Sequence, residues 1–296
     1  MKYLLAVSGG VDSMVLFDIY KKENIVVAHF NHKLRPSADD DEEFVRKTCQ
    51  ENKVRFEVGY LELKPGEKIS EERARAERYK FLNQIKAQLE QESPEKVKIC
   101  TAHHLDDLAE TVMINLIRGT AWRGLTPFSS EVYRPFIQDD DILKPESKAD
   151  ILVYASRNKI HFREDPTNFE PDFLRNRVRE KLSTLDPEEK YQLNQKIKQL
   201  WKRQTEIRKE IETILEEITE QTDFKEQGII ERNWFYDLDE KTALEILKYF
   251  LNLKNISLTT PQLKDFFDAI KNYIPEKRFN LPGDRLVTIH KTYLKF

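Results

Sequence analysis

A short run of small and polar residues near the N-terminus has the composition of a phosphate-binding turn. Ser8-Gly9-Gly10-Val11-Asp12-Ser13 follows an apolar segment directly and leads into a helical pattern. Such a turn directs free backbone N–H groups and the positive end of a helix dipole at an anion, and glycine lets the backbone approach without a Cβ in the way. Ser8 and Ser13 add hydroxyl donors. Asp12 beside a phosphate implies that Mg²⁺ lies between the two, so the run predicts a site for a magnesium-bound phosphate.

The run differs from the common P-loop, because no lysine follows its glycines. Its Ser-Gly-Gly-Val-Asp-Ser pattern resembles the PP-loop of the ATP pyrophosphatases. In that superfamily the loop holds the pyrophosphate part of ATP while the substrate attacks the α-phosphate, so the resemblance implies ATP as a cosubstrate. The alternative is a glycine turn before an ordinary helix, and the position after an N-terminal strand argues against it.

A second polar run, Thr101-Ala102-His103-His104-Leu105-Asp106-Asp107-Leu108-Ala109-Glu110-Thr111, begins at the end of a predicted strand and continues into a helix. Asp107 and Glu110 are three residues apart, so they share one helix face, and Asp106 is suited to cap the helix. Two carboxylates on one face repel each other unless a cation lies near them. Mg²⁺ or the ammonium of a substrate would serve, and capping with solvated carboxylates is the alternative.

Two further segments are rich in arginine. Arg75 and Arg78 lie in a charged helical pattern and are suited to bind phosphate or carboxylate groups. Between Arg175 and Lys209 there are eleven Lys and Arg residues against five Asp and Glu, a local balance of +6 in a chain whose net charge is −3. This basic stripe predicts a track for nucleic-acid phosphates. A solvated helix face with salt bridges is the alternative.

Alternating strand and helix patterns must position these residues. Strands are predicted at residues 2–7, 25–30, 54–60 and 97–101. Helices are predicted at residues 12–22, after Ser37, at 69–91 and at 105–118, and a helix follows the turn before Arg175. This alternation predicts an α/β fold with a parallel sheet and helices on both faces. Ligands of such sheets bind beyond the carboxyl ends of the strands, so the glycine turn, His29–Arg35 and Thr101–Asp107 are expected to converge on one crevice.

The pattern changes after Pro187, which predicts a catalytic domain over residues 1–186 and a smaller domain over 187–296. The second domain is expected to be mostly helical, with helices at 188–221, 240–252 and 260–272. A short β tail is expected from Arg278 to Phe296, turning at Pro282-Gly283-Asp284.

The composition limits the class of protein. The 296 residues are 39 % hydrophobic and 34 % charged, which suits a soluble protein. Cys49 and Cys100 are far apart and form no Cys-x-x-Cys pair, which argues against disulfides, zinc and an iron–sulfur cluster and favours two small core residues. The sequence shows no signal peptide and no apolar run of membrane length, so we expect a cytoplasmic protein without a membrane partner.

Taken together, the motifs resemble the tRNA(Ile)-lysidine synthetase family. The resemblance covers most of residues 1–180, and beyond about residue 186 it is one of architecture only. The matching segments are Ser8–Ser13, His29-Phe30-Asn31-His32 with Leu34-Arg35, Ala74-Arg75 with Arg78-Tyr79, His103-His104 with Asp106-Asp107 and Glu110-Thr111, Arg118-Gly119, Glu164-Asp165-Pro166-Thr167-Asn168, and Arg175-Asn176 with Arg179. The resemblance implies a PP-loop (adenine nucleotide alpha hydrolase-like) fold.

The family joins L-lysine to C2 of cytidine 34 in the CAU anticodon of tRNA(Ile), through an O2-adenylated intermediate, and releases AMP and pyrophosphate. The resemblance therefore implies ATP and Mg²⁺ as cofactors and this tRNA and lysine as partners. It also implies that the domain over residues 1–186 binds ATP and that the domain over 187–296 binds the tRNA. It implies catalytic roles for Asp12, Arg75, Asp107 and Glu110, cofactor binding by Ser8–Ser13, and metal binding by Asp12. Substrate binding is implied for His32, Arg35, Arg78, His103, Arg175, Asn176 and Arg179.

Two other classes of function and the oligomeric state stay open on the sequence. A tRNA thiolase or an amide-forming synthetase of the same superfamily is one class, although thiolases generally need a catalytic cysteine or a cluster and this chain has no suitable pair. A non-catalytic nucleotide-sensing or RNA-binding module is another. Monomer and dimer both stay open as the oligomeric state.

Overall fold

The computed structural model describes residues 1–34, 37–62, 69–119, 132–139, 144–163, 173–220 and 224–296. The chain forms two compact units, Met1–Gln204 and Thr205–Phe296. The division lies inside α8 (Pro187–Glu220), whereas the sequence pattern placed the domain boundary before this helix. The first half of α8 belongs to the first unit because Ile197 and Trp201 are buried in one of its apolar clusters.

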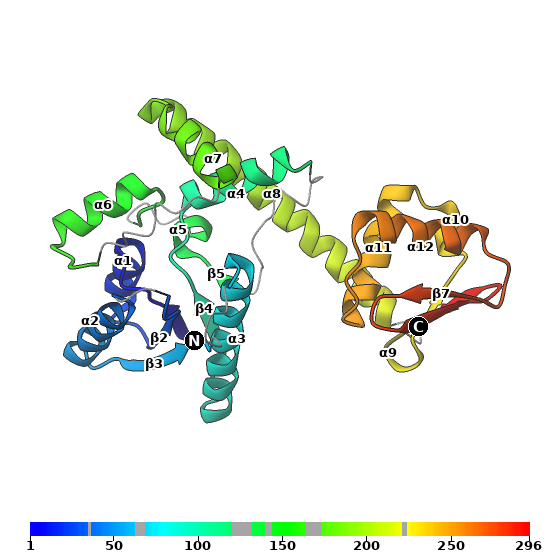
Figure 1. The fold of residues 1–296 in the computed structure, drawn as a ribbon, viewed down its shortest axis with the longest axis horizontal. Coiled ribbons are helices and arrows are strands. Elements are labelled where there is room, and N and C mark those ends of the chain that lie inside the picture. Colours follow the sequence, from blue (N-terminus) through cyan, green and yellow to red (C-terminus); the bar gives the residue numbers. More distant parts are fainter. Residues whose placement is uncertain (35–36, 63–68, 120–131, 140–143, 164–172, 221–223) are drawn as a thin grey trace. The chain divides into compact units, whose positions relative to one another are not determined.

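A five-stranded parallel sheet forms the centre of the first unit (Figure 1). Its strands are β1 (Lys2–Ala6), β2 (Ile25–Asn31), β3 (Arg55–Tyr60), β4 (Val97–Cys100) and β5 (Val132–Tyr133), in the spatial order β3-β2-β1-β4-β5. The structure confirms the predicted α/β class and the first four strands. The fifth strand was not predicted, because two residues carry no measurable alternation.

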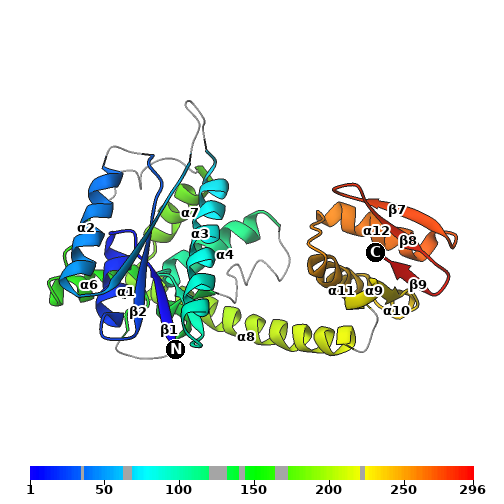
Figure 2. The same ribbon diagram turned by 90° about the horizontal axis from the view of Figure 1, so that it is seen from below.

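Helices cover both faces of this sheet, since neighbouring strand residues point to opposite sides. Leu5 packs in one cluster with residues of α1 (Val11–Tyr20), α2 (Ala38–Glu51) and α6 (Lys148–Arg157). Leu4 packs in another with Leu82 and Leu89 of α3 (Glu71–Glu92). Figure 2 shows α3 across the sheet from α1, α2 and α6.

A third apolar cluster joins the remaining helices of this unit. Leu108 of α4 (Leu105–Ile117) packs with Ile137 of α5 (Pro135–Gln138), Val178 of α7 (Phe173–Ser183) and Trp201 of α8. Helix α4 and the arginine-rich α7 match the sequence prediction. Helices α5 and α6 lie in a part of the chain for which no element was predicted.

The strand order places a reversal of winding, where open parallel sheets bind ligands, next to β1. From β1 the chain proceeds to β2 and β3 on one side, and then returns to β4 and β5 on the other. The direction of winding therefore reverses between β1 and β4, and open parallel sheets bind ligands at the carboxyl ends of the strands at such a reversal. The glycine turn follows β1, and Thr101 to His104 follow β4.

The second unit combines helices with a four-stranded antiparallel sheet of order β6-β9-β8-β7. Its helices are α9 (Phe224–Gln227), α10 (Trp234–Asp237), α11 (Glu240–Leu253) and α12 (Thr260–Asn272). Its strands are β6 (Ile229–Glu231), β7 (Lys277–Leu281), β8 (Arg285–Ile289) and β9 (Tyr293–Lys295). The predicted turn joins β7 to β8, and Gly283 there has a φ of 78°. Among the described residues of both units, no helix has the length and apolarity needed to cross a membrane.

Candidate active site

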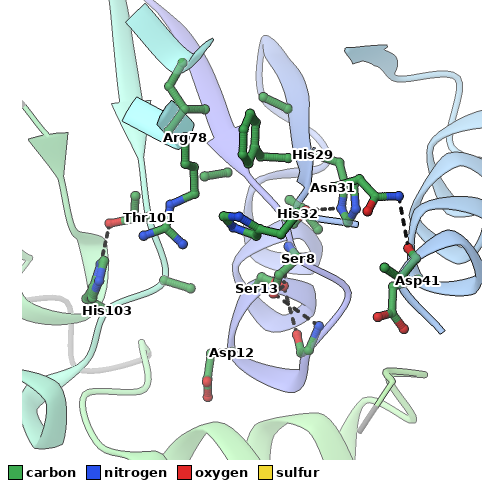
Figure 3. A pocket seen from close by; sticks show the side chains of 18 of the residues that line it. Ser8, Asp12, Ser13, His29, Asn31, His32, Asp41, Arg78, Thr101 and His103 are labelled. Carbon is green, nitrogen blue, oxygen red and sulfur yellow. Dashed lines mark hydrogen bonds between the residues drawn. The ribbon is translucent and has the colours of Figure 1, made fainter. Parts of the chain in front are cut away.

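A cavity of about 570 Å³ lies at the carboxyl ends of β1, β2 and β4 (Figure 3). Its lining comes from the glycine turn, from the end of β2 with the residues that follow it, and from the segment after β4. The wall also includes Arg78 and Leu82 of α3, Ala38 and Asp41 of α2, and Asp107 of α4. The three polar segments that the sequence singled out thus meet in one place.

The glycine turn is held by the side chain of Ser13. Its Oγ accepts hydrogen bonds from the backbone N–H groups of Ser8 (3.1 Å) and Gly9 (3.2 Å) and donates one to the carbonyl of Gly10 (2.9 Å). Gly9 has a φ of 95°, which side chains other than glycine's disfavour. Ser13 therefore shapes the turn, whereas the sequence suggested it as a hydroxyl donor to phosphate. The hydroxyl of Ser8 stays close to Gly10 N and lines the cavity.

The N-terminus of α1 is suited to bind phosphate. Gly10 is its N-cap, and it has no side chain that could accept hydrogen bonds from the N–H groups of the first turn. The N–H groups of the first turn are the donors that an anion can use. A Cβ added to Gly10 would meet only Ser8 Oγ, at 3.6 Å, so the side of Gly10 that faces the cavity is open. These features fit the polyphosphate of ATP.

Asp12 is an acidic residue in the first turn of α1, beside this candidate phosphate site. Its Oδ1 forms an ion pair with Lys148 Nζ of α6 at 2.6 Å, and His104 Nε2 lies 3.9 Å away. The side chain is one-third exposed and lines the cavity. Mg²⁺ is often bound by one or two carboxylates together with substrate phosphates, so this single carboxylate fits a metal that arrives with a nucleotide. The described residues contain no ready cluster of three metal-ligating side chains.

Asp107 and Glu110 share one face of α4, as the spacing predicted, but their surroundings differ. The Asp107 carboxylate accepts a hydrogen bond from the His104 backbone N–H at 3.0 Å and lines the cavity. Burial raises the pKa of Asp107, and the charges of Glu110 and Asp12 add to that shift. Glu110 is buried and binds the guanidinium of Arg179 through two hydrogen bonds of 2.8 and 3.0 Å.

For Glu110, the cation expected beside these carboxylates is an arginine of the chain itself. Arg179 of α7 occupies both oxygens of Glu110, which ties α7 to α4. Asp106 links α4 to α6 and α8, whereas the sequence suggested it as a helix cap. It accepts a hydrogen bond from the Lys148 N–H (2.7 Å) and forms an ion pair with Lys190 of α8 (2.7 Å). Burial by itself would raise the pKa of Asp106, but these two contacts outweigh it and the pKa is lowered.

Histidines on the cavity wall are held neutral. Burial lowers the pKa of His32 to about 4, and the charge of Arg78 adds to this effect. Burial also lowers the pKa of His103, together with the charges of Arg134, Arg75 and Arg78. His103 Nδ1 lies 2.8 Å from Thr101 Oγ1, as Figure 3 shows. Neutral rings can accept as well as donate hydrogen bonds, which suits contacts with a nucleobase or a hydroxyl.

Arg75 and Arg78 of α3 lie one turn apart and differ in position. Arg78 lines the cavity, and Figure 3 shows its guanidinium between His32 and Thr101. Arg75 is exposed, with its guanidinium 5.1 Å from the centre of the Tyr79 ring. Arg175 and Asn176 lie on α7, outside the lining of the cavity.

Some sequence predictions fall on residues outside the described part of the chain, namely Arg35 and the segment 164–168. Conversely, Lys148 and Arg134 belong to the surroundings of the cavity but were missed by sequence reasoning. Arg134 is 1 % exposed and donates a hydrogen bond to the carbonyl of Val132. Neither residue belongs to a motif with a chemical signature, and only their contacts distinguish them.

Comparisons with known proteins agree with this geometry. Residues 1–185 match the model of the PP-loop domain family. A tRNA(Ile)-lysidine synthase from Petrotoga mobilis is 33 % identical over 228 residues, which cover 71 % of this chain and 70 % of the relative. The synthase from Thermotoga maritima is 30 % identical over 283 residues, which cover 91 % of this chain and 62 % of the relative.

Among solved structures, the U34-tRNA thiolase NcsA from Methanococcus maripaludis with its [4Fe-4S] cluster is similar in fold. The TM-score is 0.51 at 21 % sequence identity, over 68 % of this chain and 72 % of that one. This likeness supports the PP-loop fold. The sequence match over two thirds of the Petrotoga relative is more specific, and by it this chain belongs to the tRNA(Ile)-lysidine synthase family of PP-loop proteins.

Proposed function

We propose that this protein is a tRNA(Ile)-lysidine synthetase. It transfers the adenylyl group of ATP to O2 of cytidine 34 in the CAU anticodon of tRNA(Ile), and the ε-amine of L-lysine then displaces AMP at C2. The observation that carries the proposal is the 33 % identity to a synthase of this name over 71 % of the chain. The cavity at the strand reversal supports it, because a nucleotide-sized site lies beside the glycine turn.

In this proposal the glycine turn binds the pyrophosphate part of ATP. Ser8, Gly9, Gly10, Val11 and Ser13 shape the turn or offer backbone donors at the start of α1. Asp12 would hold Mg²⁺, whose charge offsets the negative charge on the leaving pyrophosphate. The described geometry supports this assignment, since the N-terminus of α1 lacks a capping side chain and Asp12 lies one residue into the helix.

The second half of the reaction requires a neutral lysine amine. A lysine amine has a pKa of about 10.4, so its deprotonation at pH 7 costs roughly 4.6 kcal/mol and a base is needed. We assign this role to Asp107, because its pKa is raised and its carboxylate lines the cavity. Glu110 is assigned to positioning, since Arg179 already occupies both of its oxygens.

The tRNA would be bound by the cavity wall and by the basic stripe. An anticodon loop offers single-stranded bases that can be splayed into a pocket, where Arg78, His32 and His103 lie, with Arg75 beside them for the phosphate. Along α7 and α8 the basic stripe holds Arg175 and Asn176. Some of its charge is used within the unit, as in the ion pair of Lys198 with Glu146, while residues such as Lys196 and Arg203 are exposed.

A thiolase is the second candidate, because a solved thiolase shares the fold. The thiols of this chain argue against it. Cys49 and Cys100 are 1 % and 0 % exposed, both are free, and burial raises the pKa of each to about 12. A thiol with such a pKa is protonated at neutral pH and is a poor nucleophile.

The test is incubation of the purified protein with ATP, Mg²⁺, labelled lysine and an unmodified tRNA(Ile) transcript with the CAU anticodon. Stable label on the tRNA, with AMP and pyrophosphate as products, is the expected result. A transcript with uridine at position 34 is the matched control and should take no label. Formation of ADP and phosphate, or thiolation in the presence of a sulfur donor, would overturn the proposal.

A further inference from the structure

A lysine from a distant part of the chain lies beside the glycine turn. Lys148 Nζ is 2.6 Å from Asp12 Oδ1, although 136 residues separate the two in sequence. P-loops carry a lysine directly after their glycines, which reaches the terminal phosphates of the nucleotide. The glycine turn of this chain has none in that position. The fold thus supplies from α6 a cation that the motif itself lacks.

The position of Lys148 is fixed by the start of α6. Ser147 caps this helix by accepting a hydrogen bond from the Asp150 N–H, and Asp150 accepts one in return from the Ser147 N–H. The Lys148 N–H donates to Asp106 of α4 at 2.7 Å. One turn further, Ile151 is fully buried in the cluster that contains the apolar face of α1. The backbone of Lys148 is therefore anchored to both α1 and α4, and only the side chain is free to change partner.

The charges around this point favour such a change of partner. Without a ligand, the ammonium of Lys148 neutralises Asp12, which would otherwise repel a phosphate. If Asp12 held Mg²⁺, its carboxylate would no longer be available to the Lys148 ammonium, which would then be left beside the glycine turn. Both side chains of the pair are more than one-third exposed, so the exchange requires no repacking of the core.

We propose that Lys148 binds the β- and γ-phosphates of ATP and stabilises the departing pyrophosphate, an inference that rests on the proposed function. As the cytosine O2 forms its bond to the α-phosphorus, the bond from that phosphorus to the bridging oxygen breaks. The oxygen leaves with the electron pair, and negative charge grows on the pyrophosphate. The protonated Lys148 faces this charge and transfers no proton. Its contribution is larger in the transition state than in the ground state, so it raises the rate as well as the affinity.

The test compares ATP with AMP, which lacks the phosphates that Lys148 is proposed to bind. In Lys148→Met, the affinity for ATP with Mg²⁺ is expected to fall by roughly 10- to 100-fold, the loss of a charged hydrogen bond. The affinity for AMP should stay within about twofold. Lys148→Arg should restore most of the ATP affinity. Lys47→Met, on the exposed side of α2, is the matched control and should change neither affinity.

A structural role through Asp12 makes a different prediction. If Lys148 acted only by holding Asp12, Lys148→Met would have no further effect on pyrophosphate binding in an Asp12→Asn background. We expect a further loss of roughly tenfold or more in the double variant, measured with inorganic pyrophosphate by calorimetry. If Lys148→Met left the ratio of ATP to AMP affinity unchanged while the wild-type protein transferred lysine, the inference would be overturned but the proposed function would hold. If the wild-type protein transferred no lysine to the tRNA, the proposed function itself would be refuted.

Discussion

Buried polar side chains are distributed differently in the two units of this protein. In the described part of Met1–Gln204 they gather at the carboxyl ends of the strands and on α4, where His104, Asp106 and Glu110 are all less than 9 % exposed. In the described part of Thr205–Phe296 the buried charge is Arg232, which donates hydrogen bonds to the carbonyls of Ile270, Tyr273 and His290. Buried charges of the first unit pair with side chains of other helices, as Glu110 does with Arg179 and Asp106 with Lys190. They lie close to Asp107, which lines the cavity. The buried charge of the second unit is instead satisfied by backbone carbonyls.

The strongest test of the comparison is Asp12→Ala. Removal of this carboxylate is expected to lower lysine incorporation into tRNA(Ile) by at least about 1000-fold, because the proposed Mg²⁺ would lose its protein ligand and the phosphates their charge balance. Unfolding free energy should change by less than about 1 kcal/mol, since the Asp12–Lys148 pair is exposed to solvent. Labelled-lysine transfer and chemical denaturation measure the two effects. Retained activity would refute the assignment of Asp12.

The opposite pattern is expected for Arg232→Met. Three carbonyls lose their donor, and an unsatisfied buried group costs about 1–3 kcal/mol. One of the three hydrogen bonds is buried and two are partly buried, so we expect the second unit to lose about 3 kcal/mol of stability. Hydrogen exchange of β8 and α12 should report the loss, while ATP affinity stays unchanged. Arg285→Met is the control, because Arg285 is exposed and donates to the carbonyls of Lys254 and Asn255. An equal effect of both variants would contradict the role assigned to Arg232.

Asp107→Asn distinguishes the two carboxylates of α4. If Asp107 is the base, as proposed, its loss is expected to slow lysine transfer by about 100-fold, with adenylation less affected. In the wild type, transfer should decline as the pH falls through the raised pKa of Asp107, because the base becomes protonated. A carboxyl with a raised pKa in the folded state destabilises the fold once the pH exceeds its unfolded pKa. Asp107→Asn should therefore increase the unfolding free energy at pH 7.

Glu110→Gln is the matched comparison for Asp107→Asn. It breaks the paired hydrogen bonds with Arg179 and is expected to cost about 1–3 kcal/mol of stability, with transfer retained within about tenfold. Quench-flow measurement of the transfer step at several pH values would separate the two variants. A larger loss of transfer in Glu110→Gln would reverse the assignment of the base.

The smallest effects are expected at the two glycines of the turn. Gly9→Ala places a Cβ at a φ of 95° and 3.4 Å from Val45 Cγ2, which should cost about 1–3 kcal/mol of stability. Gly10→Ala meets only Ser8 Oγ at 3.6 Å and should leave stability nearly unchanged. Its Cβ would instead crowd the phosphate, so ATP affinity should fall. Thermal unfolding and ATP titration of the two variants check this difference, and a stable Gly9→Ala would contradict it.

Much of the fold could be predicted because its signals are local. Strands β1 to β4 and helices α1 to α4 of the first unit follow from apolar runs, alternation and capping residues in the sequence. Strand β5 and helix α5 were missed because two and four residues are too few to show a period. The boundary after residue 186 was predicted at the start of a long helix. The structure divides inside that helix, since Trp201 packs on α4.

The motifs of the site were visible in the sequence, but several partners were not. In the sequence, Asp107 and Glu110 are two acidic residues three positions apart, and nothing local distinguishes their roles. Their difference arises from Arg179, which lies 69 residues from Glu110, and from the cavity that Asp107 lines. Similarly, Ser13 looks like a phosphate donor until its hydrogen bonds to the turn are known.

By itself the sequence determined the type of fold, the place of the glycine turn and the family, because these depend on short runs of adjacent residues. The tertiary structure alone decided which carboxylate is paired, which histidines are neutral and which lysine stands beside the turn. Ion pairs and burial join residues that are far apart in the chain, as with Lys148 and Asp12, and the free energy of a charge depends on those neighbours. No local pattern carries that information.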